Sequence, residues 1–270
     1  MIKLAVAGAA GRMGGRILTL ATADPDFIIT GALEHAEHPH LGQDIGQCLG
    51  LKPLGVRIEA DDEKVFSKAD VVIDFSHHST LQDHLRQAVK KKKRYVVGTT
   101  GLDDQHLKAI RAASRSIAVV QSPNMSVGVN LLFKLAELAA KTLDEGYDLE
   151  ISETHHRMKK DAPSGTAVKL LEVLADARKK NIAKDTVYGR VGEVGARPRG
   201  QIGVLAMRGG DVVGDHTVFY FGDGERLELT HRASSRDAFA QGALRAAKFI
   251  VGRKSGLYDM QQVLGISGLK

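Results

Sequence analysis

The segment from Glu153 to Thr166 concentrates the side chains of this chain that are best suited to chemistry. It holds two adjacent histidines, His155 and His156, followed by Lys159 and a Ser-Gly-Thr turn. Histidine can donate or accept a proton near neutral pH, and lysine carries a fixed positive charge. The turn precedes a helical pattern, and the first N–H groups of a helix lack intrahelical partners, so they can bind an anion. The segment therefore predicts a reaction on a small anionic substrate that must receive a proton.

A second group of residues, near the N-terminus, has the spacing of a dinucleotide-binding loop. Glycines at positions 8, 11 and 14 follow an apolar strand pattern and open a helical one, a variant of the known fingerprint. Glu34 lies 20 residues beyond Gly14, at the end of the second strand pattern, where a carboxylate can accept from the adenine-ribose hydroxyls. A glycine turn that only packs a helix on a strand is the alternative. The combination favours NADH or NADPH binding.

Two further loops follow predicted parallel strands, and open α/β sheets bind ligands at those ends. They are Gly98-Thr99-Thr100 and Ser122-Pro123-Asn124-Met125, and both offer polar groups to a nicotinamide or its ribose. Glu34 also bears on cofactor choice, because a carboxylate there repels a 2′-phosphate. The next residue, His35, would pair with that phosphate less firmly than arginine. NADH or dual use is therefore favoured over strict use of NADPH.

The elements that must position these residues fall into two patterns. The first 126 residues alternate apolar strands (2–7, 27–33, 71–75, 95–97, 117–120) with helices (12–21, 80–90, 104–113), typical of a doubly wound parallel sheet of the Rossmann type. Residues 34–55 are expected to form a long loop before a short strand at 56–58. Later strands, at 148–152, 201–207, 216–221 and 226–230, alternate polar and apolar residues, which predicts a mixed sheet with one wet face. Residues 186–199 are expected to form an exposed loop.

We therefore expect an α/β chain of two domains. Residues 1–126 with 237–270, which include a C-terminal helix at 237–251, form the dinucleotide-binding domain. Residues 127–236 form an α+β domain that binds substrate and mediates oligomerisation.

Composition narrows the functional class. The formal charge is +6, but aromatic residues make up 5% of the 270 residues and tryptophan is absent, so stacking surfaces for nucleic acid are scarce. No apolar run approaches the roughly 20 residues of a membrane span. The lone cysteine, Cys48, disfavours thiol catalysis and fits a reducing compartment. We expect a cytoplasmic enzyme without nucleic-acid or membrane partners.

Three other interpretations of the reactive segment stay open on the residues alone. Zinc would need three or four converging ligands, and the remaining histidines are scattered along the sequence, so no metal is expected. A different Rossmann reductase, such as a semialdehyde dehydrogenase, would want a cysteine at the second-domain junction, where Cys48 does not lie. A non-catalytic dinucleotide sensor would not require His155 or Lys159.

Taken together, these motifs resemble the dihydrodipicolinate reductase family over essentially the whole chain. The glycine loop, Gly98-Thr-Thr-Gly101 and the 124–130 segment contribute to the resemblance. The most specific part is Glu153-x-His-His-x-x-Lys-x-Asp-Ala-Pro-Ser-Gly-Thr-Ala167. The resemblance implies hydride transfer from NAD(P)H to a cyclic dicarboxylate, 4-hydroxy-tetrahydrodipicolinate, with loss of water, in the diaminopimelate route to lysine.

The resemblance also implies roles for particular residues and an assembly state. His155 would donate or accept a proton, Lys159 would be a second proton donor, and His156, Gly165 and Thr166 would hold the substrate. A homotetramer built through the second domain's sheet is implied as well. The cofactor would contact Gly8, Ala9, Ala10, Gly11, Arg12, Met13, Glu34, Gly98, Thr99, Thr100, Ser122, Pro123, Asn124 and Met125.

The sequence departs from the family pattern at two positions. Many members carry arginine after the acidic residue, where this chain has His35, and some carry arginine where it has His77. Both differences weaken the expectation of a strong NADPH preference.

Overall fold

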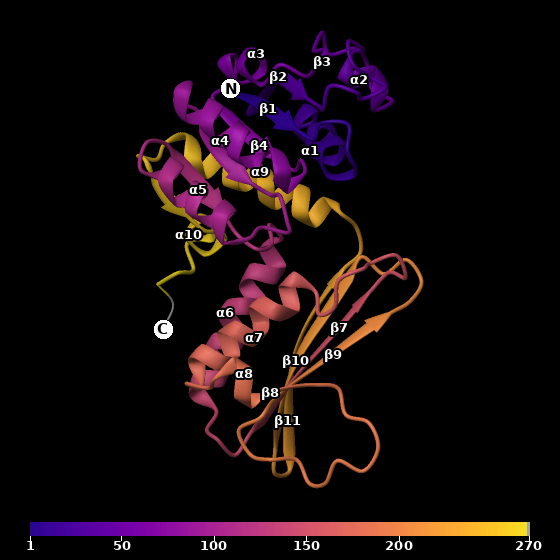
Figure 1. Cartoon of the computed structure of the whole chain (residues 1–270), viewed down its shortest axis with the longest axis vertical. Helices are drawn as coiled ribbons and strands as arrows, with labels where there is room; N and C mark the ends of the chain where they lie inside the picture. The colour runs from indigo at the N-terminus through magenta and orange to yellow at the C-terminus, as the bar shows by residue number, and fades with distance from the viewer. Residues whose placement is uncertain (269–270) are drawn as a thin grey trace. The chain divides into compact units, whose positions relative to one another are not determined.

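The computed structural model describes residues 1–268, which divide into two compact units (Figure 1). The first unit comprises Met1–Val127 and Arg236–Gly265, and the second comprises Gly128–Ser235 with the described residues after Gly265. The chain thus leaves the first unit and returns to it, and the yellow C-terminal helix lies among the indigo and purple elements (Figure 1). Within residues 1–268, no helix combines the length and apolar character needed to cross a membrane.

The first unit is built on a seven-stranded sheet in which every strand pair is parallel. The strand order is β12-β6-β5-β4-β1-β2-β3, which confirms the Rossmann-type prediction. The strands are β1 (Ile2–Ala7), β2 (Phe27–Leu33), β3 (Ile58–Glu59), β4 (Val71–Asp74), β5 (Arg94–Val97), β6 (Ala118–Gln121) and β12 (Gly256–Tyr258). The helices are α1 (Arg12–Thr22), α2 (Ile45–Cys48), α3 (Asp62–Ser67), α4 (Leu81–Lys90), α5 (Asp104–Ser114), α9 (Asp237–Val251) and α10 (Met260–Leu264), with a 3₁₀ turn at His78–Thr80.

Helices cover both faces of this sheet because alternate side chains of each strand point to opposite sides. Leu4 and Val6 of β1 join a core with residues of α1, α9 and α10. Ala5 and Ala7, the intervening residues, join a separate core with residues of α3, α4 and α5. A continuous apolar strand is therefore buried on two sides, as the sequence predicts.

The strand order reverses at β1, which pairs with β2 on one side and β4 on the other. Crossovers in opposite directions leave a crevice at the carboxyl end of such a strand, where open α/β sheets bind ligands. The glycine loop follows β1 directly, so the topology places it at this switch point.

The structure of the first unit differs from the sequence expectations in several short elements. The predicted loop at 34–55 contains the helical turn α2, and the following strand is Ile58–Glu59 instead of 56–58. The short helix α3 and the edge strand β12 had no expected counterpart. These elements are two to six residues long, which is too short for a periodic pattern to identify them.

The second unit contains a five-stranded mixed sheet in the order β11-β10-β7-β9-β8, confirming the mixed-sheet prediction. β10 is antiparallel to β11 and β7, whereas β9 is parallel to β7 and β8. The elements are α6 (Val127–Thr142), β7 (Asp148–His155), α7 (Gly165–Ala177), α8 (Ile182–Asp185), β8 (Thr186–Tyr188), β9 (Ile202–Arg208), β10 (Gly214–Gly222) and β11 (Glu225–Ala233).

Helices α6 and α7 pack on one face of this sheet and bury its core, which includes Ile151, Val218 and Tyr220. The opposite face carries apolar side chains that residues 1–268 leave exposed. Leu205 and Met207 of β9 are 48% and 51% exposed, and Phe219 stacks on Phe221 of β10. The sheet thus has one buried and one exposed face, although the exposed face is more apolar than a wet face usually is.

The expected loop at 186–199 is wrong at its start, because Thr186–Tyr188 pairs with β9 as β8. Two arginines from the following residues anchor the remainder. Arg190 and Arg197 donate to the Glu150 carboxylate of β7 at 2.8 and 3.1 Å. Ionic contacts between residues 40 or more positions apart leave no local signal in the sequence.

The close approach of α9 to the loop after β6 predicts a selective effect of a single methyl group. A Cβ atom at Gly242 would lie 1.7 Å from the Met125 carbonyl oxygen, whereas one at Gly252 would meet no atom within 4 Å. We expect Gly242→Ala to lower the free energy of unfolding by about 1–3 kcal/mol, and Gly252→Ala to change it by less than about 0.5 kcal/mol. Urea unfolding followed by circular dichroism measures both. Equal stability of the two variants would contradict this packing.

Candidate active site

The glycine loop of the first unit has a backbone that other residues could not adopt. Gly8 has φ +73°, and a Cβ there would lie 2.7 Å from the Phe75 carbonyl oxygen. A Cβ at Gly14 would lie 2.0 Å from the Gly8 carbonyl oxygen. The glycines therefore let the loop, the start of α1 and the end of β4 approach one another, as the fingerprint predicts.

The start of α1 is suited to receive an anion. Its N-cap, Gly11, has no side chain to bond the first N–H groups, and the first turn contains no acidic residue. Helix N-termini of this kind bind phosphates through free N–H groups and the helix dipole. The structure also brings Glu34 to this loop, since its Oε1 accepts the Ala10 backbone N–H at 2.9 Å. The predicted ribose-binding carboxylate therefore lies beside the predicted pyrophosphate site.

The loops after β5 and β6 lie at the same edge of the sheet, because parallel strands end together. Gly98 packs on the Phe75 ring, where an added Cβ would come within 2.2 Å of a ring carbon. Thr99 is buried, and its hydroxyl donates toward the Asp74 carbonyl at 3.3 Å, while Thr100 is exposed. Thr99 therefore faces the protein interior, and Thr100 is the hydroxyl that solvent can reach.

The loop 122–125 combines polar and buried groups. Asn124 Oδ1 accepts the Ser126 backbone N–H at 2.8 Å, and Met125 is 3% exposed within the core under α1 and α9. Ser122 and Pro123 are more accessible. The buried Met125 side chain anchors the loop, so a cofactor could contact only the backbone of Met125.

Sequence reasoning missed a buried carboxylate that links these loops. Asp74, at the end of β4, is fully buried. It accepts hydrogen bonds from the Ser76 N–H at 2.8 Å, from His84 Nδ1 at 3.0 Å and from the Tyr95 hydroxyl. Burial raises the pKa of Asp74, but the hydrogen bonds and the charge of His84 outweigh it and hold the pKa below its usual value. Asp74 therefore remains an anion that fixes the loop after β4.

The histidine pair of the second unit lies where β7 ends. Alternate residues of β7 are buried, and His155 continues this alternation at 9% exposure, whereas His156 is more accessible. The two imidazoles thus face different sides, as extended backbone predicts. The backbone N–H of His156 donates to the Val212 carbonyl at 2.8 Å, which ties the end of β7 to the loop before β10.

Glu153 organises this site, and its role was not predicted. The side chain is 1% exposed. Its Oε2 lies 2.6 Å from His155 Nδ1, its Oε1 accepts the Ser164 backbone N–H at 3.0 Å, and Arg208 donates to both oxygens at 2.8 and 2.9 Å. Burial raises the pKa of Glu153, but hydrogen bonds from Arg208, His155 and Ser164 outweigh burial and lower it. Glu153 is therefore ionised, and His155 presents Nδ1–H to it, which leaves Nε2 for a ligand.

Opposing effects set the charge of His155. Burial lowers the pKa of its imidazole below the usual 6.5, the hydrogen bond and charge of Glu153 oppose that shift, and the cations Lys159 and Arg208 add to it. The neutral imidazole is thus favoured in the ligand-free chain. A bound anion near the ring would favour the protonated form.

A second imidazole, His216 of β10, lies behind the first. Its ring centroid is 5.1 Å from that of His155, and its Nε2 lies 3.0 Å from the Ser164 hydroxyl. Its Nδ1 is buried and has no hydrogen-bond partner within residues 1–268. Burial lowers the pKa of His216 to about 3, so this histidine stays neutral and supports Ser164.

Ser164 is the N-cap of α7 and connects the imidazoles to the start of that helix. Its hydroxyl accepts the Ala167 backbone N–H at 3.2 Å as the N-cap, and the first turn of α7 has no acidic residue. Gly165 is exposed, and a Cβ added there would meet no atom within 4 Å, whereas Thr166 is 7% exposed. The start of α7 therefore offers an accessible positive helix end close to His155.

Lys159 lies in the turn between β7 and α7, as the sequence requires. Its Nζ contacts both oxygens of Asp161 at 3.0 and 2.9 Å. Asp161 is anchored through its carbonyl, which accepts from Arg208 at 2.6 Å. Arg208 thus ties the lysine turn to Glu153. In sum, the second unit gathers His155, Lys159 and the start of α7, and the first unit gathers the predicted cofactor residues.

Comparison with known proteins reveals extensive similarity. The family model described as "Dihydrodipicolinate reductase, N-terminus" matches residues 2–125, and the one described as "Dihydrodipicolinate reductase, C-terminus" matches residues 128–264. The 4-hydroxy-tetrahydrodipicolinate reductases of Syntrophotalea carbinolica and Nitrosomonas europaea are each 50% identical to the chain. Both alignments cover 98% of the chain, with 100% and 98% of the respective relative.

A solved structure shares the fold at lower identity. The dipicolinate-bound dihydrodipicolinate reductase from Paenisporosarcina sp. TG-14 superimposes with a TM-score of 0.75 at 23% identity. The alignment covers 97% of this chain and 98% of that one.

The buried neutral His216 predicts a stability loss in acid. Its pKa is about 3 in the folded protein against 6.5 as the ordinary value, so the unfolded chain binds more protons between these pH values. Stability from this group is complete above pH 6.5 and falls by at most about 1.4 kcal/mol per pH unit below it. We expect His216→Gln to flatten this acid dependence, and the exposed His40→Gln to retain it. Urea unfolding from pH 7 to 4.5 measures both slopes; parallel slopes for the wild type and His216→Gln would exclude His216 as the cause.

Proposed function

The chain belongs to the dihydrodipicolinate reductase family, and from this premise we propose how its residues carry out the reaction. The chain is an oxidoreductase that uses NADH or NADPH to reduce 4-hydroxy-tetrahydrodipicolinate, in the diaminopimelate route to lysine. The net reaction takes one hydride and one proton and releases one water. We propose the roles of individual residues, the assembly state and the cellular compartment.

In the first unit, we assign cofactor binding to the loops at the switch point. The start of α1 receives the pyrophosphate, and Glu34 accepts a ribose hydroxyl through the oxygen that Ala10 does not hold. The loops 98–100 and 122–125 contact the nicotinamide half. When bound, NADH or NADPH supplies the hydride. The first-turn N–H groups lack a side-chain cap and support this assignment.

In the second unit, we assign the dicarboxylate substrate to the start of α7. The N–H groups of Gly165 and Thr166 bind one carboxylate, and His156 and Lys159 contribute positive or hydrogen-bonding groups. The related structure named above is described as bound to dipicolinate, a planar dicarboxylate, and this supports the assignment.

We assign the proton to His155, with Lys159 as a second donor. Hydride addition builds electron density that an acid must neutralise. Glu153 holds Nδ1–H, so His155 Nε2 is the atom that exchanges a proton with the substrate. The carboxylates of the bound substrate raise the pKa of His155 and so counteract the effect of burial. His155 therefore becomes protonated when the substrate, which accepts the proton, is bound. The buried Glu153–His155 pair next to an open helix N-terminus is the observation that carries this proposal.

We also propose a cytoplasmic homotetramer. The uncovered face of the second unit's sheet supports assembly, because Leu205, Met207 and Phe221 remain 37–51% exposed there. Exposed apolar patches on a sheet commonly mark protein–protein interfaces.

The proposed activity is tested by following oxidation of NADH and of NADPH with substrate generated in place from pyruvate and aspartate semialdehyde by the preceding synthase. We expect oxidation that depends on both precursors. His155→Gln should lower turnover about 10²-fold or more, the typical contribution of a general acid, while NADH affinity stays unchanged because the glycine loop is intact. Full turnover by the variant would remove His155 from proton transfer. Dinucleotide binding without any oxidation would favour a sensor.

A positioning role for Glu153 predicts a change in pH dependence as well as rate. Glu153→Gln removes the charge that opposes deprotonation of His155, so the pKa of His155 should fall further. The alkaline loss of activity should then move to lower pH, and kcat should drop about tenfold or more. Glu150→Gln is the matched control, because Glu150 lies on the same strand and binds two arginines but no imidazole. An unshifted pH–rate profile in folded Glu153→Gln would leave Glu153 with a structural role only.

A further inference from the structure

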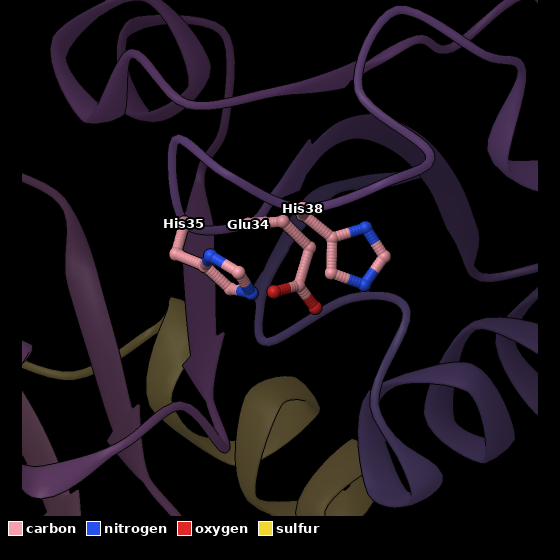
Figure 2. Close-up of side chains that lie close together, drawn as sticks. All are labelled: Glu34, His35 and His38. Carbon is pink, nitrogen blue, oxygen red and sulfur yellow. The ribbon is translucent and has the colours of Figure 1, made fainter.

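We propose that the first unit contains a site for a divalent transition-metal ion such as Zn²⁺, formed by Glu34, His35 and His38, and that the metal competes with NADH. Each of the three side chains offers one ligand atom, and these atoms all lie within 4.8 Å of one another. Figure 2 shows the Glu34 carboxylate between the two imidazole rings, with a ring nitrogen of His35 close to a carboxylate oxygen. The three residues lie within five consecutive positions of the sequence, and the fold directs their side chains toward one another.

A turn after β2 creates the cluster. The backbone N–H of His38 donates to the His35 carbonyl at 3.0 Å, so residues three positions apart turn back toward each other. Their ring centroids are 5.3 Å apart. The backbone N–H of Glu34 donates to the Glu59 carbonyl at 2.9 Å, which fixes the start of the turn against β3. The backbone of this turn therefore holds the side chains of Glu34, His35 and His38 close together.

The donor set is specific for a class of metal. Two imidazoles and one carboxylate suit zinc and its neighbours, while calcium and magnesium prefer oxygen ligands alone. Tetrahedral zinc with bonds of about 2 Å needs ligand atoms about 3.4 Å apart. The His35 ring is 59% exposed, so small rotations can close the difference. Water would occupy the remaining position.

Competing contacts of the imidazoles are weak. His35 Nδ1 lies 3.5 Å from Glu37 Oε2, and His38 Nδ1 accepts the His40 backbone N–H at 3.2 Å. Both contacts are exposed and the first is long, and such hydrogen bonds are much weaker than metal–imidazole coordination. A metal ion can therefore displace them.

We expect the metal to compete with NADH because both would bind the Glu34 carboxylate. This competition rests on the proposed cofactor role of Glu34. One Glu34 oxygen is held by the Ala10 N–H at 2.9 Å. The other can accept a ribose hydroxyl or bind a metal ion, but not both. Metal binding at this position would consequently weaken cofactor binding without changing the proposed reacting centre in the second unit.

The test uses the full-length protein, freed of metal by chelation and dialysis, and zinc sulfate as the probe. Calorimetry measures zinc stoichiometry, and NADH fluorescence measures cofactor affinity with and without zinc. His38→Gln removes one ligand, and His40→Gln is the matched control because His40 lies in the same loop but outside the three-residue cluster. We expect the wild type and His40→Gln to bind one more zinc equivalent than His38→Gln. Zinc should weaken NADH binding about tenfold or more in both, but not in His38→Gln.

Two outcomes would overturn the inference. The first is equal zinc binding by the wild type and His38→Gln, which would locate the ion elsewhere, for example at the adjacent rings of His77 and His78. The second is zinc binding at His38 that leaves NADH affinity unchanged. Glu34→Gln without zinc tests the proposed cofactor role separately: unchanged NADH affinity in that variant would refute the ribose contact, while zinc stoichiometry still reports on the metal site.

Discussion

The second unit depends on one buried anion, the Glu153 carboxylate. Its two oxygens receive Arg208 from β9, the Ser164 N–H from the start of α7, and His155 from its own strand. A buried charge without partners costs free energy, because nothing replaces the water that it loses. Removing one partner from a satisfied network of hydrogen bonds therefore destabilises the whole network. The carboxylate therefore couples the position of the His155 imidazole to the position of the start of α7. The reactive groups share one anchor.

Asp74 has the same role in the first unit. It lies at the carboxyl end of β4, fully buried, and binds Ser76, His84 and Tyr95. Loops carry most binding groups, yet they lack the regular hydrogen bonds that hold strands in place. A buried carboxylate at a strand end supplies several strong acceptors at the point where the ladder stops. Both units thus stabilise functional loops by the same physical means.

Features that depend on neighbouring residues could be predicted from the sequence, whereas features that depend on residues far apart in the chain could not. The glycine loop, Glu34 and the opposite-facing His155 and His156 depend on local spacing, and the sequence predicts their placement. The partners Arg208 and His216 come from strands β9 and β10, 55 and 63 residues after Glu153. Only the sheet register, which pairs Glu153 with His216, brings them together. No periodic pattern encodes that register, so the network emerges only in the folded chain.

The same network bears on the proposed role of His155 as an acid. Burial and two cations favour the uncharged ring of His155, while Glu153 opposes them; a further negative charge near the ring would favour the protonated form. In the proposed assignment, a dicarboxylate at the start of α7 would bring that charge. On the proposed assignment, the substrate's own negative charge would shift His155 toward the protonated form that donates the proton.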